Sequence, residues 1–444
     1  MTSSLACRTA VKAAAIFLAL GLSGCERAGA GMSVGDDPDL GLLTTVMHQV
    51  GASYVKKVSS RELVTDALRG MLSRLDPHSD YMDERQYREM VSVTRGRFGG
   101  IGIELTLEGG VPQIISPIDG TPAANAGIEP GDRIVKVDGV PTAGMDSGEV
   151  VKRLRGAVGT KVTLTILRRG RAPFDVALTR AIVRVVSVKS KLQPGKIGYA
   201  RITTFVENTP GEFADAVSQM QGAAGGRLNG FILDLRNDPG GLLDAAVDIA
   251  GDFLDGGTVV TTRGRDSEDD HVYTAPVAGD MLRGAPVVVL INSASASASE
   301  IVAGALKDNR RATVMGNRSF GKGSVQSIIP LDGQGALRLT TALYYTPSGQ
   351  SIQDRGIEPD MVVQLPKDEA VANTIIGHES DLYGAFKNAG PLGGHGDAPA
   401  ALPSRAEEHP INPMLIGTSR DFQFESALHY LQHRGRQASA APRG

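Results

Sequence analysis

The chain has 444 residues, which is enough for about three domains of ordinary size and a large buried core. Hydrophobic residues make up 41% and charged residues 21%, proportions that exclude a disordered chain and a multi-pass membrane protein. The formal net charge of −3 provides no basic field for binding nucleic acid. With only two cysteines, Cys7 and Cys25, the chain has neither a disulfide framework nor a cysteine-based zinc site.

The first 25 residues predict an export signal. Arg8 and Lys12 supply positive charge, and residues 13–22 form an apolar run that is too short to span a bilayer. The following Leu-Ser-Gly-Cys is similar to a bacterial lipobox, in which cleavage leaves Cys25 as a lipid-carrying N-terminus. We therefore expect a membrane-anchored lipoprotein on the periplasmic side of a bacterial cell envelope. The alternative is a plain signal peptide that covers 1–24 and releases a soluble periplasmic or secreted protein.

Shifts in composition divide the rest of the chain. Residues 25–38 are rich in Gly and Asp and predict a lipidated N-terminus followed by a linker. Helical spacing of apolar residues over 39–96 predicts a helical region with a turn at Pro77. Over 97–183, short β-rich runs and two helical stretches alternate with Gly, Pro and Asp turns. This order predicts a compact, partly open β-barrel.

Strands and helices alternate over residues 184–365, which predicts a core with a mostly parallel sheet and a ligand site at the carboxyl ends of its strands. Residues 366–444 predict a C-terminal tail that is poorly ordered over 389–419 and 434–444. A short helix is expected near 422–431. The fold class is therefore mixed α/β with several domains.

A glycine-rich segment opens the first strand of the expected barrel. Glycine there lets the N–H groups of Ile101, Gly102 and Ile103 turn toward one point, a nest that can hold a carboxylate beside an apolar pocket. A glycine-rich hairpin without a ligand would show the same pattern. The segment 122–134, Pro-Ala-Ala-Asn-Ala-Gly-Ile-Glu-Pro-Gly-Asp-Arg-Ile, together with its flanking strands, resembles a PDZ domain of the bacterial protease type. This resemblance implies capture of C-terminal peptides.

A run of serines follows one of the buried strands of the α/β segment. Ser297 and Glu300 have the spacing of a capping box at the start of a helix. The same helix N-terminus favours negative charge, so a serine there can also be a nucleophile. The spacing does not choose among the four candidates, Ser293, Ser295, Ser297 and Ser299.

A serine nucleophile needs a base, and all eight histidines lie outside the loops that follow the predicted strands. A lysine can serve when burial leaves it neutral. Lys322 is the candidate because Phe and Gly flank it, whereas an exposed turn lysine is the alternative. Residues 316–322 also fit a phosphate-binding loop, but Gly323 stands where Ser or Thr should hold magnesium. A β-like stretch follows instead of a helix, which argues against nucleotide hydrolysis.

Two motifs carry a resemblance to a known family, Ser-Ala-Ser-Ala-Ser-Glu at 295–300 and Phe-Gly-Lys-Gly-Ser-Val-Gln at 320–326. Supporting motifs lie in the family's order at 75–79, 99–103, 233–241, 339–342, 345–349 and 356–359. Together they closely resemble the carboxyl-terminal processing proteases, also called tail-specific proteases, of peptidase family S41. The resemblance identifies 97–183 as the PDZ domain and 184–365 as the protease core.

The family resemblance implies a role for particular residues. Ser297 would be the nucleophile of a serine endopeptidase, Lys322 its base, and Gln326 the residue that orients the lysine. The N–H groups of Ala298 and Gly241 would form the oxyanion hole. No metal or other cofactor is implied, and the substrates would be proteins recognised by their C-terminal tails; a homo-oligomer or an adaptor protein is left open. The alternative from another class is a non-catalytic PDZ scaffold, which would tolerate loss of Ser297 or Lys322, yet both are present.

Overall fold

The computed structural model describes residues 38–108, 110–118, 120–371, 377–388, 390 and 410–440. The expected leader, Cys25 and most of the expected linker lie outside the described residues, as does most of the glycine- and proline-rich part of the tail. The chain forms two compact units, one that ends at Asp66 and one that begins at Ala67. Within the described ranges, no helix is long and apolar enough to cross a membrane.

The N-terminal region is helical, as predicted. The first unit contains α1 (Pro38–Ser53) and the beginning of α2 (Ser60–Leu72), which Ser59 caps by accepting the Glu62 N–H at 3.2 Å. The second unit contains the rest of α2 and then α3 (Glu84–Thr94). The turn expected at Pro77 separates α2 from a short strand that precedes α3.

The chain enters the expected PDZ domain through β2 (Arg97–Gly100) and leaves it through β9 (Ala181–Arg184), and these two strands pair in antiparallel fashion. Its main sheet has the order β3-β4-β5-β7-β8, with β6 paired to β5. The bounds are β3 (Ile103–Glu108), β4 (Val111–Pro117), α4 (Pro122–Asn125), β5 (Arg133–Val137), β6 (Val140–Pro141), α5 (Ser147–Leu154), β7 (Lys161–Leu167) and β8 (Phe174–Thr179). Apart from β6, which the sequence did not predict, this is the predicted order of strands and helices.

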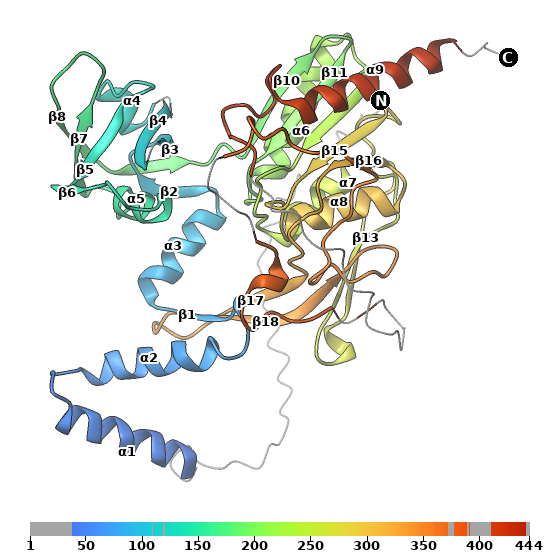
Figure 1. Cartoon of the computed structure of the whole chain (residues 1–444). Coiled ribbons are helices and arrows are strands. Elements are labelled where there is room, and N and C mark those ends of the chain that lie inside the picture. Colours follow the sequence, from blue (N-terminus) through green and yellow to red (C-terminus); the bar gives the residue numbers. More distant parts are fainter. Residues whose placement is uncertain are drawn as a thin grey trace, which may run out of the picture. The chain divides into compact units, whose positions relative to one another are not determined.

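The core contains a six-stranded sheet in the order β10-β11-β12-β15-β16-β19, in which every pair is parallel except β10–β11. Its strands are β10 (Val188–Gln193), β11 (Ile197–Ile202), β12 (Gly230–Asp234), β15 (Val287–Ile291), β16 (Ala312–Gly316) and β19 (Met361–Val362). The helices that cover it are α6 (Thr209–Ala223), α7 (Leu243–Gly251), α8 (Ala298–Asp308) and α9 (Phe422–Ala440). Figure 1 shows the strands β10, β11, β15 and β16 of this sheet together with the helices α6 and α8.

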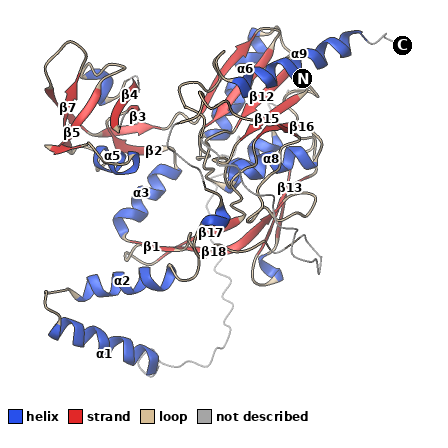
Figure 2. Ribbon diagram, viewed as in Figure 1, coloured by secondary structure: helices blue, strands red, loops and turns tan. Residues whose placement is uncertain are grey.

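Side chains of this sheet alternate between two apolar clusters, as the two-residue period of a strand requires. Phe231 and Leu233 pack with residues of α6, α7 and α8, whereas Ile232 packs with Phe424 and other residues of α9. Helices therefore cover both faces of the sheet (Figure 2). Because both faces are buried, these strands are apolar at successive positions in the sequence.

A second sheet in the same core is antiparallel and has the order β1-β18-β13-β14, with β17 paired to β18. Its strands are β1 (Asp80–Met82), β13 (Thr258–Arg263), β14 (His271–Thr274), β17 (Ser324–Pro330) and β18 (Ala336–Tyr345), and two 3-10 turns span Ser267–Asp269 and Glu379–Asp381. The expected mostly parallel sheet thus describes one of two sheets. In the second sheet, β18 pairs with β13 and with β1, which lie far from it in the sequence and carry no local signal of their partnership.

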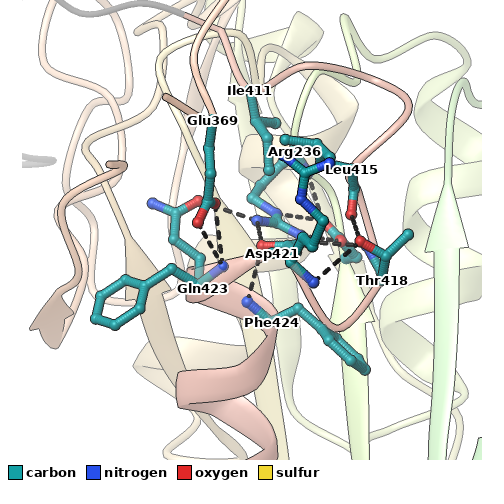
Figure 3. Close-up of polar contacts among 12 residues, drawn as sticks. Arg236, Glu369, Ile411, Leu415, Thr418, Asp421, Gln423 and Phe424 are labelled. Carbon is teal, nitrogen blue, oxygen red and sulfur yellow. Dashed lines mark hydrogen bonds and ion pairs between the residues drawn. The ribbon is translucent and has the colours of Figure 1, made fainter. Parts of the chain in front are cut away.

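A buried ionic network fastens the C-terminal segment to the core (Figure 3). Arg236 donates from Nη2 to Asp234 and to Asp421, each at 2.6 Å, and all three side chains are fully buried. Nη1 donates to Asp421 at 2.8 Å and to Gln423 at 3.0 Å. The expected short helix is longer than predicted: α9 continues past the last apolar position, Leu431, into residues such as Arg, Gln and Ala that favour helices.

We expect Asp421→Asn to lower the free energy of unfolding by about 3 kcal/mol, because it leaves the buried Arg236 cation with one counter-ion in place of two. Urea unfolding followed by circular dichroism measures the change. Glu425→Gln makes the same chemical change one turn further along α9 on a partly buried residue and should cost less than about 0.5 kcal/mol. Equal stability of the two variants would contradict this role of Asp421.

Candidate active site

Three loops meet at the carboxyl ends of the parallel strands β12, β15 and β16. These strands are neighbours in the sheet and run in one direction, so the loops that follow them leave from one edge. The loops also bond to one another: the Ala296 N–H donates to the Asp238 carbonyl and the Phe320 N–H to the Ser295 carbonyl, each at 3.0 Å. The turn after β12, the serine run and the lysine loop therefore form one site.

Ser297 begins α8 in a strained backbone conformation, with φ 56° and ψ −111°. The neighbouring serines serve the backbone. The Ser295 hydroxyl donates to the Leu235 carbonyl at 2.8 Å, and the Ser299 hydroxyl donates to the Asp238 carbonyl at 3.2 Å. These contacts give two of the four candidate serines a structural task and distinguish Ser297 from them.

The buried carboxylate of Glu300 connects the serine to the lysine loop. Its Oε2 accepts the N–H of Ser297 at 2.7 Å and the N–H of Lys322 at 2.9 Å. Its Oε1 accepts the Gly321 N–H at 2.7 Å and the Ser319 hydroxyl at 2.6 Å. Burial raises the pKa of Glu300 to about 7 although these hydrogen bonds oppose the shift. The capping-box prediction gave Glu300 a role at the helix start only. The structure shows that it also accepts hydrogen bonds from the lysine loop.

Lys322 lies in a partly buried position, so the alternative of an exposed turn lysine is wrong. Its Nζ donates to Gln326 Oε1 at 2.6 Å and to the Ser324 carbonyl at 3.3 Å. Burial lowers the pKa of Lys322 to about 8, while the carboxylates of Glu379 and Glu300 oppose the shift. The hydrogen bonds of Nζ to described residues do not include one to the Ser297 hydroxyl, so the two side chains are not joined by a hydrogen bond.

Gln326, the residue expected to orient the lysine, lies on β17. Its Oε1 accepts from Lys322, and its Nε2 donates to the Ser324 hydroxyl at 3.0 Å and to the Thr340 hydroxyl at 3.2 Å. Both ends of the amide therefore have partners, and the structure brings Gln326 to Lys322.

The turn that follows β12 requires glycine where it approaches the start of α8. A Cβ added to Gly240, which has φ 94°, would lie 2.8 Å from the Ala298 nitrogen and 3.0 Å from the Ser297 Cβ. A Cβ on Gly241 would lie 2.0 Å from the Phe205 carbonyl oxygen. The N–H groups of Ala298 and Gly241, the expected oxyanion donors, have no acceptor among the described residues.

The expected carboxylate nest borders a cavity of about 320 Å³ in the PDZ domain. Ile101, Gly102 and Ile103 line it on one side, and Val151 and Leu154 of α5 on the other. Gly102 adopts φ 78°, a conformation that frees the N–H groups around it to point to one place. The three predicted residues are thus brought together beside an apolar helix face.

Sequence reasoning missed a second set of polar residues around the lysine. Asp76, His78, Thr340 and Glu379 form hydrogen bonds that lead to Gln326 or to the segment next to Lys322. The motifs at 75–79 and 339–342 contain three of them, although their spacing alone indicated no role. Within the described residues, no three His, Cys, Asp or Glu side chains are arranged to hold a metal ion.

Comparisons with known proteins agree with the division of the chain into a peptidase core and a PDZ domain. Residues 196–363 match the model of peptidase family S41, 113–168 match that of the PDZ domain, and 31–86 match the N-terminal domain of the activating protease CtpB. The matches define a peptidase with a PDZ domain.

Relatives of known name make the assignment narrower. The chain is 48% identical over 346 residues to the carboxy-terminal-processing protease of Bartonella bacilliformis, covering 77% of this chain and 79% of that one. It is 40% identical to the carboxyl-terminal-processing protease of Synechocystis sp., covering 70% and 74%. A solved structure, photosystem II D1 C-terminal processing protease, is 30% identical with a TM-score of 0.44 and covers 73% and 92%. On the first two relatives, the chain belongs to the carboxy-terminal-processing proteases of family S41.

Proposed function

We propose that the protein is an exported serine endopeptidase in which Ser297 is the nucleophile and Lys322 is the general base. The observation that carries the proposal is the shared Glu300 oxygen, which accepts the N–H of Ser297 and the N–H of Lys322. Ser297 stands at the N-terminus of α8, where the helix favours negative charge. Lys322, with its pKa lowered by burial, supplies neutral amine near neutral pH.

The proposed reaction follows from these groups. Neutral Lys322 accepts the proton of the Ser297 hydroxyl as Oγ attacks the substrate carbonyl carbon. The N–H groups of Ala298 and Gly241 stabilise the oxyanion that forms. Lys322 then gives the proton to the leaving nitrogen, and water hydrolyses the acyl-enzyme. Nζ is bonded to Gln326 and not to the Ser297 hydroxyl here, so the first step requires the amine and that hydroxyl to come within hydrogen-bond distance.

The PDZ domain is proposed to select substrates by their C-terminal tails. The nest of Ile101, Gly102 and Ile103 offers N–H donors to a terminal carboxylate, and the cavity beside it suits a small or apolar final side chain. An extended tail would add a strand beside β3.

The proposed location is the periplasmic side of a bacterial cell envelope, with Cys25 as the lipid-carrying N-terminus. The support is the leader sequence alone, whose apolar run ends in Leu-Ser-Gly-Cys. Cys25→Ser should move the protein from the membrane fraction to the soluble fraction, and an unchanged distribution would contradict the anchor.

Ser297→Ala should lower kcat/KM for an unstructured protein such as casein by roughly four orders of magnitude, because it removes the nucleophile. Lys322→Arg should be similarly inactive, since a guanidinium stays protonated near neutral pH. Ser295→Ala loses a structural hydrogen bond and should remain a protease. If the wild type cleaves no casein, the result favours the non-catalytic PDZ scaffold; if Ser297→Ala and Lys322→Arg cleave casein at the wild-type rate, the protease uses another site.

The pH dependence of kcat/KM should show a lysine base. Below a pH of about 8 the Lys322 amine is protonated and cannot accept the serine proton, so activity should rise with pH through that value and then level off. Initial rates on casein from pH 6 to pH 9.5, with circular dichroism as a check of folding, measure the profile. A flat or falling profile over this range would argue against Lys322 as the base.

A substrate with a free apolar C-terminus should be cleaved with a KM roughly tenfold lower than the same substrate with an amidated C-terminus, because amidation removes the charge that the nest accepts. Val151→Glu, which places a carboxylate in the wall of the cavity, should abolish this preference. Lys152→Glu, on the exposed adjacent position of α5, serves as the control. Equal KM values for the free and amidated tails in the wild type would mean that the domain does not read the C-terminus.

A further inference from the structure

Three hydrogen bonds lead from the lysine to an early part of the chain. Lys322 Nζ donates to Gln326 Oε1 at 2.6 Å, and Gln326 Nε2 donates to the Thr340 hydroxyl at 3.2 Å. The Thr340 hydroxyl in turn donates to Asp76 Oδ1 at 3.1 Å. Each of these groups donates to the next, and the chain of donors ends on the Asp76 carboxylate.

Asp76 is buried and surrounded by donors. It accepts the N–H of His78 at 2.8 Å, the N–H of Ser79 at 2.9 Å and the Ser79 hydroxyl at 2.6 Å. Burial by itself would raise the pKa of Asp76, but these hydrogen bonds outweigh it and hold the pKa below its ordinary value. The side chain is therefore an ionised carboxylate that can only accept.

An acceptor at the end of the chain fixes the direction of every hydrogen bond in it. Because Asp76 accepts, the Thr340 hydroxyl must donate to it and so presents a lone pair to Gln326. Gln326 must then turn its NH₂ group to Thr340, which leaves its carbonyl oxygen facing Lys322. In the opposite orientation of the amide, the NH₂ group of Gln326 would face the N–H donors of Lys322, and neither group can accept a hydrogen bond.

We propose that Asp76 and Thr340 are positioning residues for Lys322, acting through the amide orientation of Gln326. This inference rests on the proposed role of Lys322 as the base. It also gives the motifs at 75–79 and 339–342 a chemical task in the site, where sequence reasoning gave them none.

Pairing of β1 with β18 holds Asp76 in place. Asp80 pairs with Arg338, the Arg338 Nε donates to the His78 carbonyl at 2.9 Å, and the Thr340 N–H donates to the Ser79 hydroxyl at 3.1 Å. A tight turn that precedes β1 is thereby fixed against the strand that carries Thr340.

A second set of contacts connects the turn that contains Asp76 to the lysine loop through Glu379. His78 Nε2 lies 2.8 Å from the buried carboxylate of Glu379, whose own N–H donates to the Phe320 carbonyl. Four charged groups influence the pKa of Lys322. The carboxylates of Glu379, Glu300 and Asp76 raise this pKa, and the guanidinium of Arg338 lowers it.

Thr340→Val tests the hydroxyl because it keeps the shape and the strand preference of threonine. We expect kcat on casein to fall roughly tenfold to a hundredfold with KM unchanged, since the lysine loses its fixed partner. Thr340→Ser restores the hydroxyl and should recover activity to within about threefold of the wild type. Thr341→Val is the matched control: Thr341 is exposed on the opposite face of β18, where its hydroxyl contacts that of Ser327.

Asp76→Asn tests the carboxylate with a second readout. The charge of Asp76 stabilises the ammonium form of Lys322, so its removal should lower kcat and shift the rising limb of the kcat/KM profile to lower pH. Thr340→Val keeps all charges and should lower kcat without moving that limb. A merely structural loss would lower the rate of Asp76→Asn and leave the limb in place.

The outcomes separate this inference from the proposed function. If the wild type cleaves nothing, or Ser297→Ala is as active as the wild type, the proposed function fails and the inference fails with it. If Ser297→Ala is inactive but Thr340→Val equals Thr341→Val, the inference alone is overturned. The inference is also overturned if Asp76→Asn has the kcat of the wild type and the rising limb of its kcat/KM profile stays at the same pH.

Discussion

The geometry of the site depends on one buried carboxylate. An ionised Glu300 with no partners would cost several kcal/mol in this interior, and four donors at 2.6–2.9 Å compensate for that cost. The donors come from the start of α8 and from residues 319–322, so neither segment can move without leaving a buried group unsatisfied. The relative position of Ser297 and Lys322 is therefore set through the backbone. The Lys322 side chain is held in addition by its hydrogen bonds to Gln326 and Ser324.

The parallel sheet brings these segments to the carboxylate, and the C-terminal segment supports them. β12, β15 and β16 end at one edge and deliver the turn, the serine run and the lysine loop. Directly before the turn, Arg236 is held by Asp421, and Asn237 donates from Nδ2 to the Ile411 carbonyl at 3.0 Å. The turn that would bear one oxyanion donor is thus attached to residues that arrive almost two hundred positions later. The turn after β12 and the C-terminal segment are therefore physically connected.

Sequence reasoning reached the parts of the site that are encoded locally. Short apolar runs followed by glycine- and serine-rich loops predict strand ends, and the serine and lysine motifs lie in such loops. The roles of Asp76 and Glu379 could not be read in this way, because each acts through a strand pairing or a hydrogen bond across most of the chain. Glu300 has contacts of both kinds. Its capping of the helix start is local in sequence and was predicted, whereas its hydrogen bonds to Gly321 and Ser319 form only when the sheet has folded.

The choice of an amide beside the lysine has a physical reason. Burial favours the neutral form of Lys322, the carboxylates of Glu379 and Glu300 favour the charged form, and the balance leaves a pKa of about 8. A carboxylate in direct contact with Nζ would raise that pKa and retain the proton on the lysine. The neutral carbonyl of Gln326 accepts an N–H from either form of the amine. Because the charge of Asp76 lies beyond Thr340 and Gln326, it orients the lysine through hydrogen bonds and favours the ammonium form less strongly than a carboxylate in contact with Nζ would, since Coulomb interactions weaken with distance.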